Sequence, residues 1–141
     1  TNQHKTAWLQ TKPPLDCPEL TLWFCDTQFS QQINTQTRNI EKPTDVLSMP
    51  SYDFLRPCVI DQSQIPIEAF PPDLGSIFLC PEEIARRKPK LTNKALHAHF
   101  IRLIIHGACH LHGYTHDTDQ DWDVMTEKED RLLARVLDEC R

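Results

Sequence analysis

Four of the chain's seven histidines lie within one short stretch, H-G-A-C-H-L-H-G-Y-T-H, which spans residues 106 to 116. His106 and His110 are four residues apart, so on a helix they would share one face and both imidazoles could reach one ion. Gly113 permits a sharp turn that brings His116 back as a third ligand. Three neutral imidazoles leave a fourth position open for water, which is typical of a catalytic zinc site. We therefore predict that His106, His110 and His116 bind one Zn²⁺, whose water would ionise near pH 7.

Other side chains near this stretch are weaker candidates as metal ligands. His112 follows His110 by two residues and points away from the shared face while the helix lasts, so we interpret it as a non-ligand. Cys109 could approach the ion, but its thiolate would close the site. His99 lies seven residues before His106, where it could line a cleft, hydrogen-bond to a ligand or simply pack. For any single histidine, the alternative to metal binding is a core or surface position where the ring makes ordinary hydrogen bonds.

The spacing of the histidines is close to that of zinc peptidases, H-E-x-x-H-x-x-G-x-x-H, but Gly107 stands where those enzymes carry glutamate. That glutamate takes a proton from the zinc-bound water and passes it to the leaving amine. Cleavage of a phosphodiester makes a different demand, because its transition state is anionic and a cation stabilises it directly. The sequence therefore leans away from peptidase chemistry, and a peptidase is the least favoured alternative.

Hydrophobic periodicity predicts the elements that must hold these residues in place. The stretch before the histidines predicts a long helix that starts at Thr92 or Asn93 and ends near His112, with Gly113 as its terminator. Asp26 and Pro81 are well placed to begin two earlier helices. The predicted strands are residues 20–25, 46–49 and 74–80, and the other predicted helices are residues 27–36, 81–88 and 118–140.

Strands precede most of the helices along the chain, so we expect one α+β domain over residues 1–141, with helices covering a small mixed β-sheet. The three-histidine site would lie at the end of a central helix. Residues 50–73 hold five prolines and predict a long irregular insertion. Phe29 and Ile33 are the expected apolar stripe of the first helix, and Trp122 and Met125 are among the expected buried positions of the last.

The composition is that of an ordinary globular protein, with 39% hydrophobic residues and a formal net charge of -5. That charge argues against a broadly basic surface for nucleic acid, although residues 86–90 carry four positive charges. No apolar run is long enough to cross a bilayer. The six cysteines form no C-x-x-C pair, so we expect free thiols in a reducing compartment, mostly as small core residues.

Three segments, in order, resemble those of a known family. Residues 106–116 resemble H-G-x-x-H-L-x-G-Y-x-H. Residues 34–50, N-T-Q-T-R-N-I-E-K-P-T-D-V-L-S-M-P, resemble N-x-x-x-R-x-x-x-x-P-T-[DN]-V-L-S-F-P, and residues 74–77, L-G-S-I, resemble L-G-D-I. These are signatures of the YbeY family of metal-dependent endoribonucleases, which act in ribosomal RNA maturation. The resemblance covers residues 20–138.

The resemblance implies a zinc-dependent, single-strand-specific endoribonuclease that acts in ribosomal RNA maturation and ribosome assembly. It implies that the three histidines are the zinc ligands and that Arg38 lies in the same cleft and takes part in activity. A guanidinium suits that role because it pairs bidentately with phosphate and stays protonated. The basic run at residues 86–88 could follow the RNA backbone.

The chain departs from the family pattern at four positions. Ser76 and Thr115 replace aspartates, Met49 replaces phenylalanine, and Cys109 stands where leucine is common. Ser76 raises the question of whether an activity that needs a carboxylate is retained. The alternative function is therefore a zinc-binding ribosome-assembly factor with weak or no catalysis.

The resemblance also implies partners and a location. The expected partners are ribosomal RNA, the precursor small ribosomal subunit and ribosomal or assembly-factor proteins, with no membrane. The proline-rich insertion resembles organellar members of the family, and the chain begins at Thr1 instead of methionine. We therefore expect that a leader precedes this chain and that the protein is mitochondrial, with the cytoplasm as the alternative.

Overall fold

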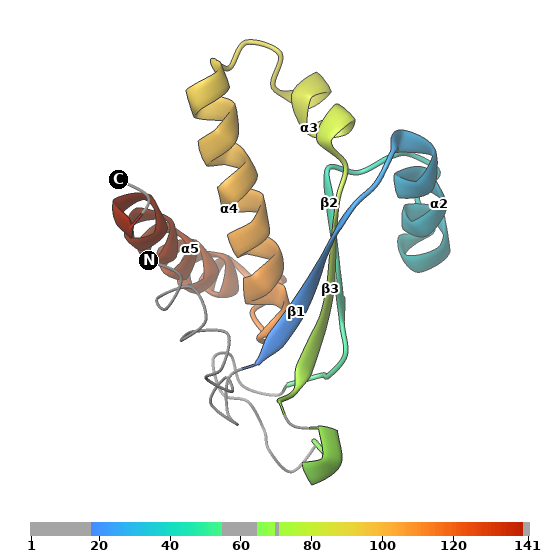
Figure 1. Cartoon of the computed structure of the whole chain (residues 1–141), viewed down its shortest axis with the longest axis vertical. Coiled ribbons are helices and arrows are strands. Elements are labelled where there is room, and N and C mark those ends of the chain that lie inside the picture. Colours follow the sequence, from blue (N-terminus) through green and yellow to red (C-terminus); the bar gives the residue numbers. More distant parts are fainter. Residues whose placement is uncertain (1–17, 55–64, 70, 140–141) are drawn as a thin grey trace, which may run out of the picture.

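The computed structural model describes residues 18–54, 65–69 and 71–139, and within them it shows a small mixed sheet of three strands. Strand β3 (Asp73–Leu79) lies in the middle, parallel to β1 (Glu19–Phe24) and antiparallel to β2 (Val46–Pro50). The three strands agree with the predicted ones to within one residue at each end. Figure 1 shows the sheet as a narrow ribbon that separates the helices into two groups.

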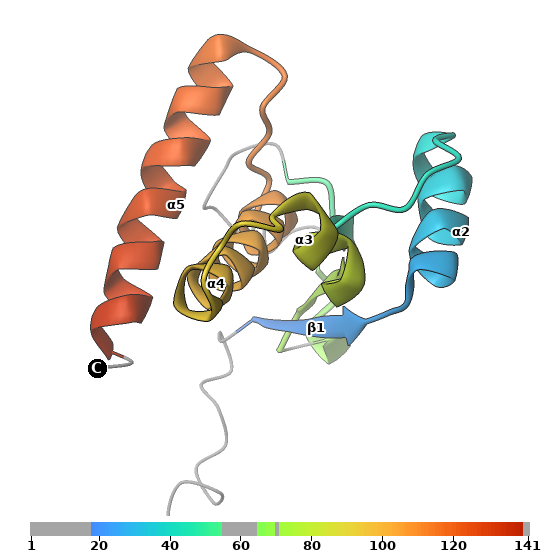
Figure 2. The ribbon, with the colours of Figure 1, turned by 90° about the horizontal axis from the view of Figure 1, so that it is seen from above.

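The helices lie on both sides of this sheet. Helix α4 (Asn93–Leu111) packs directly on β2 and β3, and α5 (Asp119–Glu139) packs on α4. Viewed from above, α5, α4, the sheet and α2 (Thr27–Arg38) follow one another as layers (Figure 2). The short helices α3 (Pro81–Arg87) and η2 (Ile67–Ala69) connect the main elements. The predicted α+β architecture is confirmed, with the three histidines at the end of the central helix α4.

Local signals in the sequence set where the helices begin and end. The Asp26 side chain accepts a hydrogen bond from the Phe29 N–H at 2.8 Å and so caps α2. Thr92 caps α4 in the same way, because its hydroxyl accepts from the Ala95 N–H at 3.2 Å. Gly113 has φ of 89°, a left-handed conformation that ends α4 and turns the chain toward His116. Each of these termini was predicted from the sequence.

The main core lies between α4 and the sheet. Ile77 and Leu79 of β3 meet Leu103 and Leu111 of α4, and all four side chains are buried. Burial of such a side chain stabilises the fold by about 1.5–3 kcal/mol, so this layer fixes the position of α4 on the sheet. A second cluster, built around Ile105 and Met125, fixes α5 on the other side of α4.

Gly107 allows α4 to lie unusually close to the sheet. A Cβ atom at this position would lie 2.8 Å from Cγ2 of Ile77, whose side chain is fully buried. Carbon atoms normally approach to about 3.5–4.0 Å, so no side chain fits without displacement. The glutamate of zinc peptidases therefore has no space at this position.

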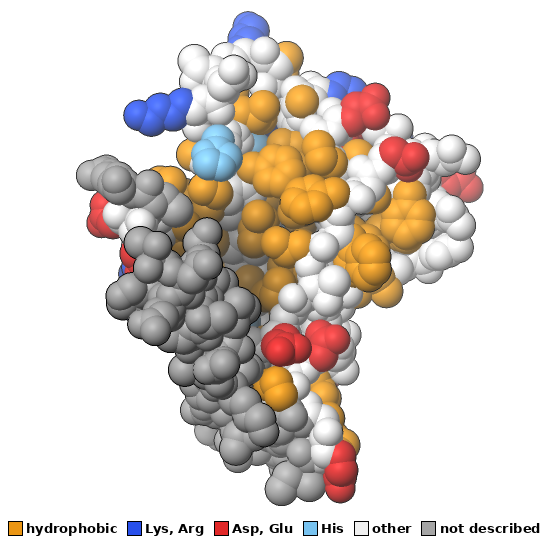
Figure 3. All heavy atoms as spheres, viewed as in Figure 1, with side chains coloured by type: hydrophobic (Ala, Val, Ile, Leu, Met, Phe, Trp, Pro, Cys, Tyr) orange, Lys and Arg blue, Asp and Glu red, His pale blue; other side chains and the backbone are white. Residues whose placement is uncertain are grey.

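Two predicted burial positions are wrong. Trp122 is 56% exposed and Phe29 is 42% exposed, because no described element covers those faces of α5 and α2. Phe29 instead meets Phe78 at the open side of the sheet, with 6.0 Å between the ring centroids. Figure 3 shows hydrophobic side chains gathered over β1, where Trp23 and Phe24 are also exposed. Helical periodicity identified the apolar faces but not what packs against them.

Some predictions fall outside the described residues. Residues 55–64 and 70 of the predicted insertion lie there, and so do Cys17, Cys58 and Cys140. The three described cysteines are not in disulfides; Cys80 and Cys109 are buried as expected, whereas Cys25 is half-buried. Within the same part of the chain, the helices are too short or too polar to cross a membrane.

Candidate metal centre

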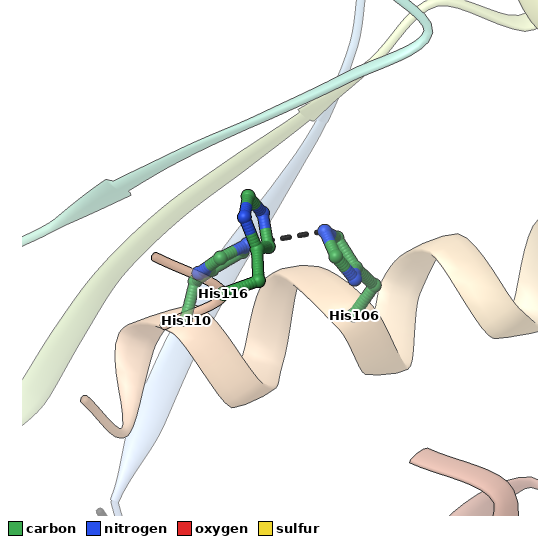
Figure 4. A group of neighbouring side chains, drawn as sticks. All are labelled: His106, His110 and His116. Atoms are coloured by element: carbon green, nitrogen blue, oxygen red, sulfur yellow. Dashed lines mark hydrogen bonds between the residues drawn. The ribbon is translucent and has the colours of Figure 1, made fainter. Parts of the chain in front are cut away.

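The three predicted ligands converge at the C-terminal end of α4. His106 and His110 project from one face of the helix, and His116 returns over them after the turn at Gly113 (Figure 4). The Nε2 atoms of His106 and His110 are 3.1 Å apart. One nitrogen of each ring lies within 4.8 Å of the others. Nitrogens that share a tetrahedral zinc ion are about 3.3 Å apart, so only small ring movements are needed and the donor set fits the ion.

The environment of His110 suits it to bind a metal. Its Nδ1–H donates to the backbone carbonyl of Tyr114 at 2.9 Å, which leaves the Nε2 lone pair facing the other histidines. Burial, together with the neighbouring His106, lowers the pKa of His110 to about 4. His110 is therefore neutral at pH 7, which is the form that coordinates metal ions.

Glu129 contributes to the site from a different helix. Its carboxylate, on α5, accepts a hydrogen bond from Nδ1–H of His106 at 2.7 Å and is 8% exposed. The sequence did not indicate this residue, because it lies 23 positions beyond His106 in an acidic helix that resembles a solvated face. The only signal was its place one turn after Met125, on the buried stripe of that helix.

Arg38 lies in the same cleft as the histidines. The cleft has a volume of about 630 Å³ and is also lined by Asp45, Ser48 and Tyr52. A depression of about 690 Å³ along α2 is larger, but its lining holds no titratable side chain. The chemistry is therefore concentrated around the histidines.

The loop after α2 fixes the position of Arg38. Asn39 adopts a left-handed conformation, with φ of 58°, and reverses the chain directly after the arginine. Ser30 then holds the loop, because its hydroxyl donates to the Thr44 carbonyl at 2.7 Å. Asn34 adds a second tie by donating from Nδ2 to the Lys42 carbonyl at 2.8 Å. Both polar side chains are buried, so the loop that carries Arg38 toward the cleft is firmly attached to α2.

The two arginines of the basic run are held by a buried carboxylate. Glu83 accepts from Nε of Arg86 and from Nε of Arg87, both at 2.9 Å. These contacts, led by the hydrogen bond from Arg86, lower the pKa of Glu83 to about 2. Arg87 also pairs with Asp45 at 3.2 Å and so ties α3 to the loop before β2. That this run follows the RNA backbone stays a prediction, and Arg87 lines the same cleft as the histidines while it pairs with Glu83 and Asp45.

Comparison with known proteins identifies the family. The family model for endoribonuclease YbeY matches residues 2–137. The chain belongs to the YbeY family. The endoribonuclease YbeY of Sinorhizobium fredii is 36% identical over 123 residues, which cover 87% of this chain and 65% of that protein. The protein of the same name from Legionella pneumophila is 35% identical over 132 residues, 94% of this chain and 77% of the relative.

A solved structure has a similar fold. The solution structure of a Thermotoga maritima protein matches with a TM-score of 0.51 and 26% identity, covering 86% of this chain and 70% of that one. The chain spans about two thirds of the length of the first curated relatives, 65% for the Sinorhizobium protein and 68% for that of Bartonella bacilliformis.

The departure from the YbeY pattern at Ser76 lies away from the metal centre. The Ser76 hydroxyl accepts a hydrogen bond from Nε1 of Trp23 at 3.2 Å. Its neighbour Ile77 faces α4, and side chains alternate along a strand, so Ser76 is on the opposite face of the sheet. Ser76 is not among the residues that line the cleft. Replacing aspartate by serine here therefore removes no carboxylate from the site.

The remaining candidate ligands do not join the cluster. Nδ1–H of His112 donates to the Ala108 carbonyl at 2.8 Å, and the side chain of Cys109 is buried between α4 and α5. Among the residues that the structure describes, the metal-binding group holds His106, His110 and His116 alone. His99, which could have lined the cleft, does not belong to its lining.

Proposed function

We propose that the protein is a zinc-dependent, single-strand-specific endoribonuclease that acts in ribosomal RNA maturation and ribosome assembly. The observation that carries the proposal is the placement of Arg38 in the same cleft as three converging imidazoles. A bound zinc ion would supply a water that ionises near neutral pH and a positive charge for the anionic transition state. The relatives' name, endoribonuclease YbeY, supports the choice of RNA as substrate.

The chain's own residues would bind and orient the RNA. Arg38 would hold the scissile phosphate through two N–H donors, which a guanidinium presents in a fixed fork. Tyr52 lines the same cleft and stacks on Phe54, with 5.5 Å between the ring centroids. An aromatic ring beside a cation is the arrangement that binds an unpaired base next to its phosphate, which favours a single-stranded substrate.

The direct test compares cleavage of a ribosomal RNA fragment as a single strand and annealed to its complement. Zinc-loaded wild type should cut the single strand, and Arg38→Ala should cut it about 100- to 1,000-fold more slowly with its zinc content unchanged. Arg131→Ala is the matched control, because that arginine is exposed on α5 and, within the described residues, its ion pair is with Glu127 one turn away. Equal traces of cleavage by wild type and by the Arg38→Ala, His110→Ala double variant would reject the nuclease.

The alternative, an assembly factor without catalysis, loses one of its arguments because Ser76 lies outside the cleft. It predicts that cells carrying Arg38→Ala at normal protein abundance mature their ribosomal RNA normally. The nuclease predicts that precursors accumulate. The proposed partners are the precursor small ribosomal subunit and its ribosomal or assembly proteins. The mitochondrial location stays a prediction, which fractionation of cells that express the whole protein would test.

A further inference from the structure

We propose that Glu129 is a positioning residue that fixes the Nδ1–H tautomer of His106 and thereby presents Nε2 of that ring to the metal. The proposal rests on the metal site of the proposed function but not on RNA as the substrate. It begins from an unusual feature of the α4–α5 contact. A carboxylate occupies a nearly buried position beside Met125. An apolar side chain could pack there without the free-energy cost of removing a charge from water.

The geometry leaves only one tautomer of His106 compatible with this carboxylate. A carboxylate only accepts hydrogen bonds, and its Oε1 lies 2.7 Å from Nδ1 of His106. With the proton on Nε2, the lone pair of Nδ1 would face that oxygen, which is repulsive. With the proton on Nδ1, the contact is a short, charge-assisted hydrogen bond and Nε2 is left as a donor to the metal.

The free nitrogen then points to the correct place. Nε2 of His106 lies 3.1 Å from Nε2 of His110, whose own tautomer is set by the Tyr114 carbonyl. The two ligands on α4 are therefore oriented by different means. His110 uses a backbone carbonyl of the adjoining turn, whereas His106 depends on a side chain from another helix.

Arg102 holds the carboxylate in place. It lies one turn before His106 on α4, and its Nη1 is 3.8 Å from the second oxygen of Glu129. Its Nη2 donates to Asp130 at 2.9 Å. Glu129 is thus held between Arg102 and His106, so the register of α5 against α4 determines the orientation of the His106 ring.

A purely structural tie between the helices would explain the same contacts, so the test needs a readout specific to His106. Asp130→Asn is the matched control, because it breaks the exposed ion pair with Arg102 at the same interface and does not touch a histidine. The test variant is Glu129→Gln, which keeps the shape and removes the charge. Tautomers are read from ¹⁵N-labelled histidine in the metal-free protein, and metal affinity from Co²⁺ titration.

We expect wild-type His106 to carry its proton on Nδ1, and Glu129→Gln to shift the ring toward a mixture of tautomers. Glu129→Gln should weaken Co²⁺ binding 10- to 100-fold. Asp130→Asn should change it less than twofold. In a His106→Ala background, Glu129→Gln should cause no further loss, because its effect passes through that ring.

Three results would overturn the proposal: a wild-type His106 with its proton on Nε2, an unchanged affinity in Glu129→Gln, or an equal loss of affinity in the His106→Ala background. The wild-type tautomer decides the matter even if Glu129→Gln does not fold. If the protein cleaves RNA but Glu129→Gln leaves the His106 tautomer and the Co²⁺ affinity unchanged, this proposal alone is refuted. A confirmed tautomer and affinity loss without any RNA cleavage refutes the nuclease alone.

Discussion

Gly107→Ala tests the close contact that places the metal-binding helix on the sheet. The added methyl group would lie 2.8 Å from Cγ2 and 3.0 Å from Cδ1 of Ile77. Ile77 is fully buried in β3, so it has no open space into which it can move. Either α4 shifts away from the sheet or Ile77 adopts a less favourable rotamer.

The expected magnitude follows from two opposing terms. Alanine favours the interior of a helix over glycine by about 1 kcal/mol. Overpacking a buried contact costs about 1–3 kcal/mol. The substitution should therefore lower the free energy of unfolding by about 1 kcal/mol. In an Ile77→Ala background the clashing atoms are gone, so Gly107→Ala should instead raise it by about 1 kcal/mol.

Urea unfolding of the four metal-free proteins measures this reversal of sign. Ile77→Ala by itself should lower the free energy of unfolding by about 2–5 kcal/mol, and a domain of ordinary stability stays folded after such a loss. If the larger truncation is too unstable, Ile77→Val is the substitute: it removes Cδ1 but keeps Cγ2, so Gly107→Ala should destabilise that background less than wild type, without a reversal of sign. A Gly107→Ala variant that is more stable than wild type, or an effect of the same sign in both backgrounds, would refute the tight helix–strand contact.

Three further predictions concern charge and capping. Glu83→Gln should lower the free energy of unfolding at pH 7 by about 1–3 kcal/mol. Because the pKa of Glu83 is about 2 in the folded protein against an ordinary 4.5, this difference should shrink as the pH falls from 4.5 to 2. Urea titrations at each pH measure it. The pKa of His110 is about 4 in the folded protein against an ordinary 6.5, so as the pH falls the unfolded chain takes up a proton at this residue before the folded chain does. Metal-free wild type should therefore lose stability as the pH falls from 6.5 to 4, and His110→Gln should lose less. Asp26→Ala removes the cap of α2 and should lower the free energy of unfolding by about 1 kcal/mol, measured by thermal unfolding, whereas the control Asp53→Ala should not.

Much of the site was predictable because its determinants are local. The four-residue spacing of His106 and His110 has a fixed meaning on a helix, and Gly113 marks where that helix must end. The position of Arg38 came from the resemblance to the YbeY family, since a lone arginine in a polar loop carries no signal of its own. Its place in the cleft depends on the loop contacts of Ser30 and Asn34.

Other parts of the site depend on tertiary contacts that a linear pattern does not contain. Glu129 reaches His106 across the α4–α5 interface, and Glu83 engages two arginines that read as a free basic run. Trp122 is exposed because no element among the described residues covers it, which periodicity cannot report. The face of the sheet that Ser76 occupies could have been predicted from strand alternation next to Ile77, but we did not predict it.

The central claim is that three histidines at the end of α4 bind one metal ion in the cleft that holds Arg38. The most direct measurement is zinc stoichiometry and affinity, by competition with a chelator, for wild type, His110→Ala and His112→Ala. We predict one zinc per chain for wild type and for His112→Ala, because the His112 ring of wild type is hydrogen-bonded to the Ala108 carbonyl. His110→Ala should bind zinc at least about 100-fold more weakly while keeping its fold. Unchanged binding by His110→Ala, or an equal loss in His112→Ala, would contradict the claim.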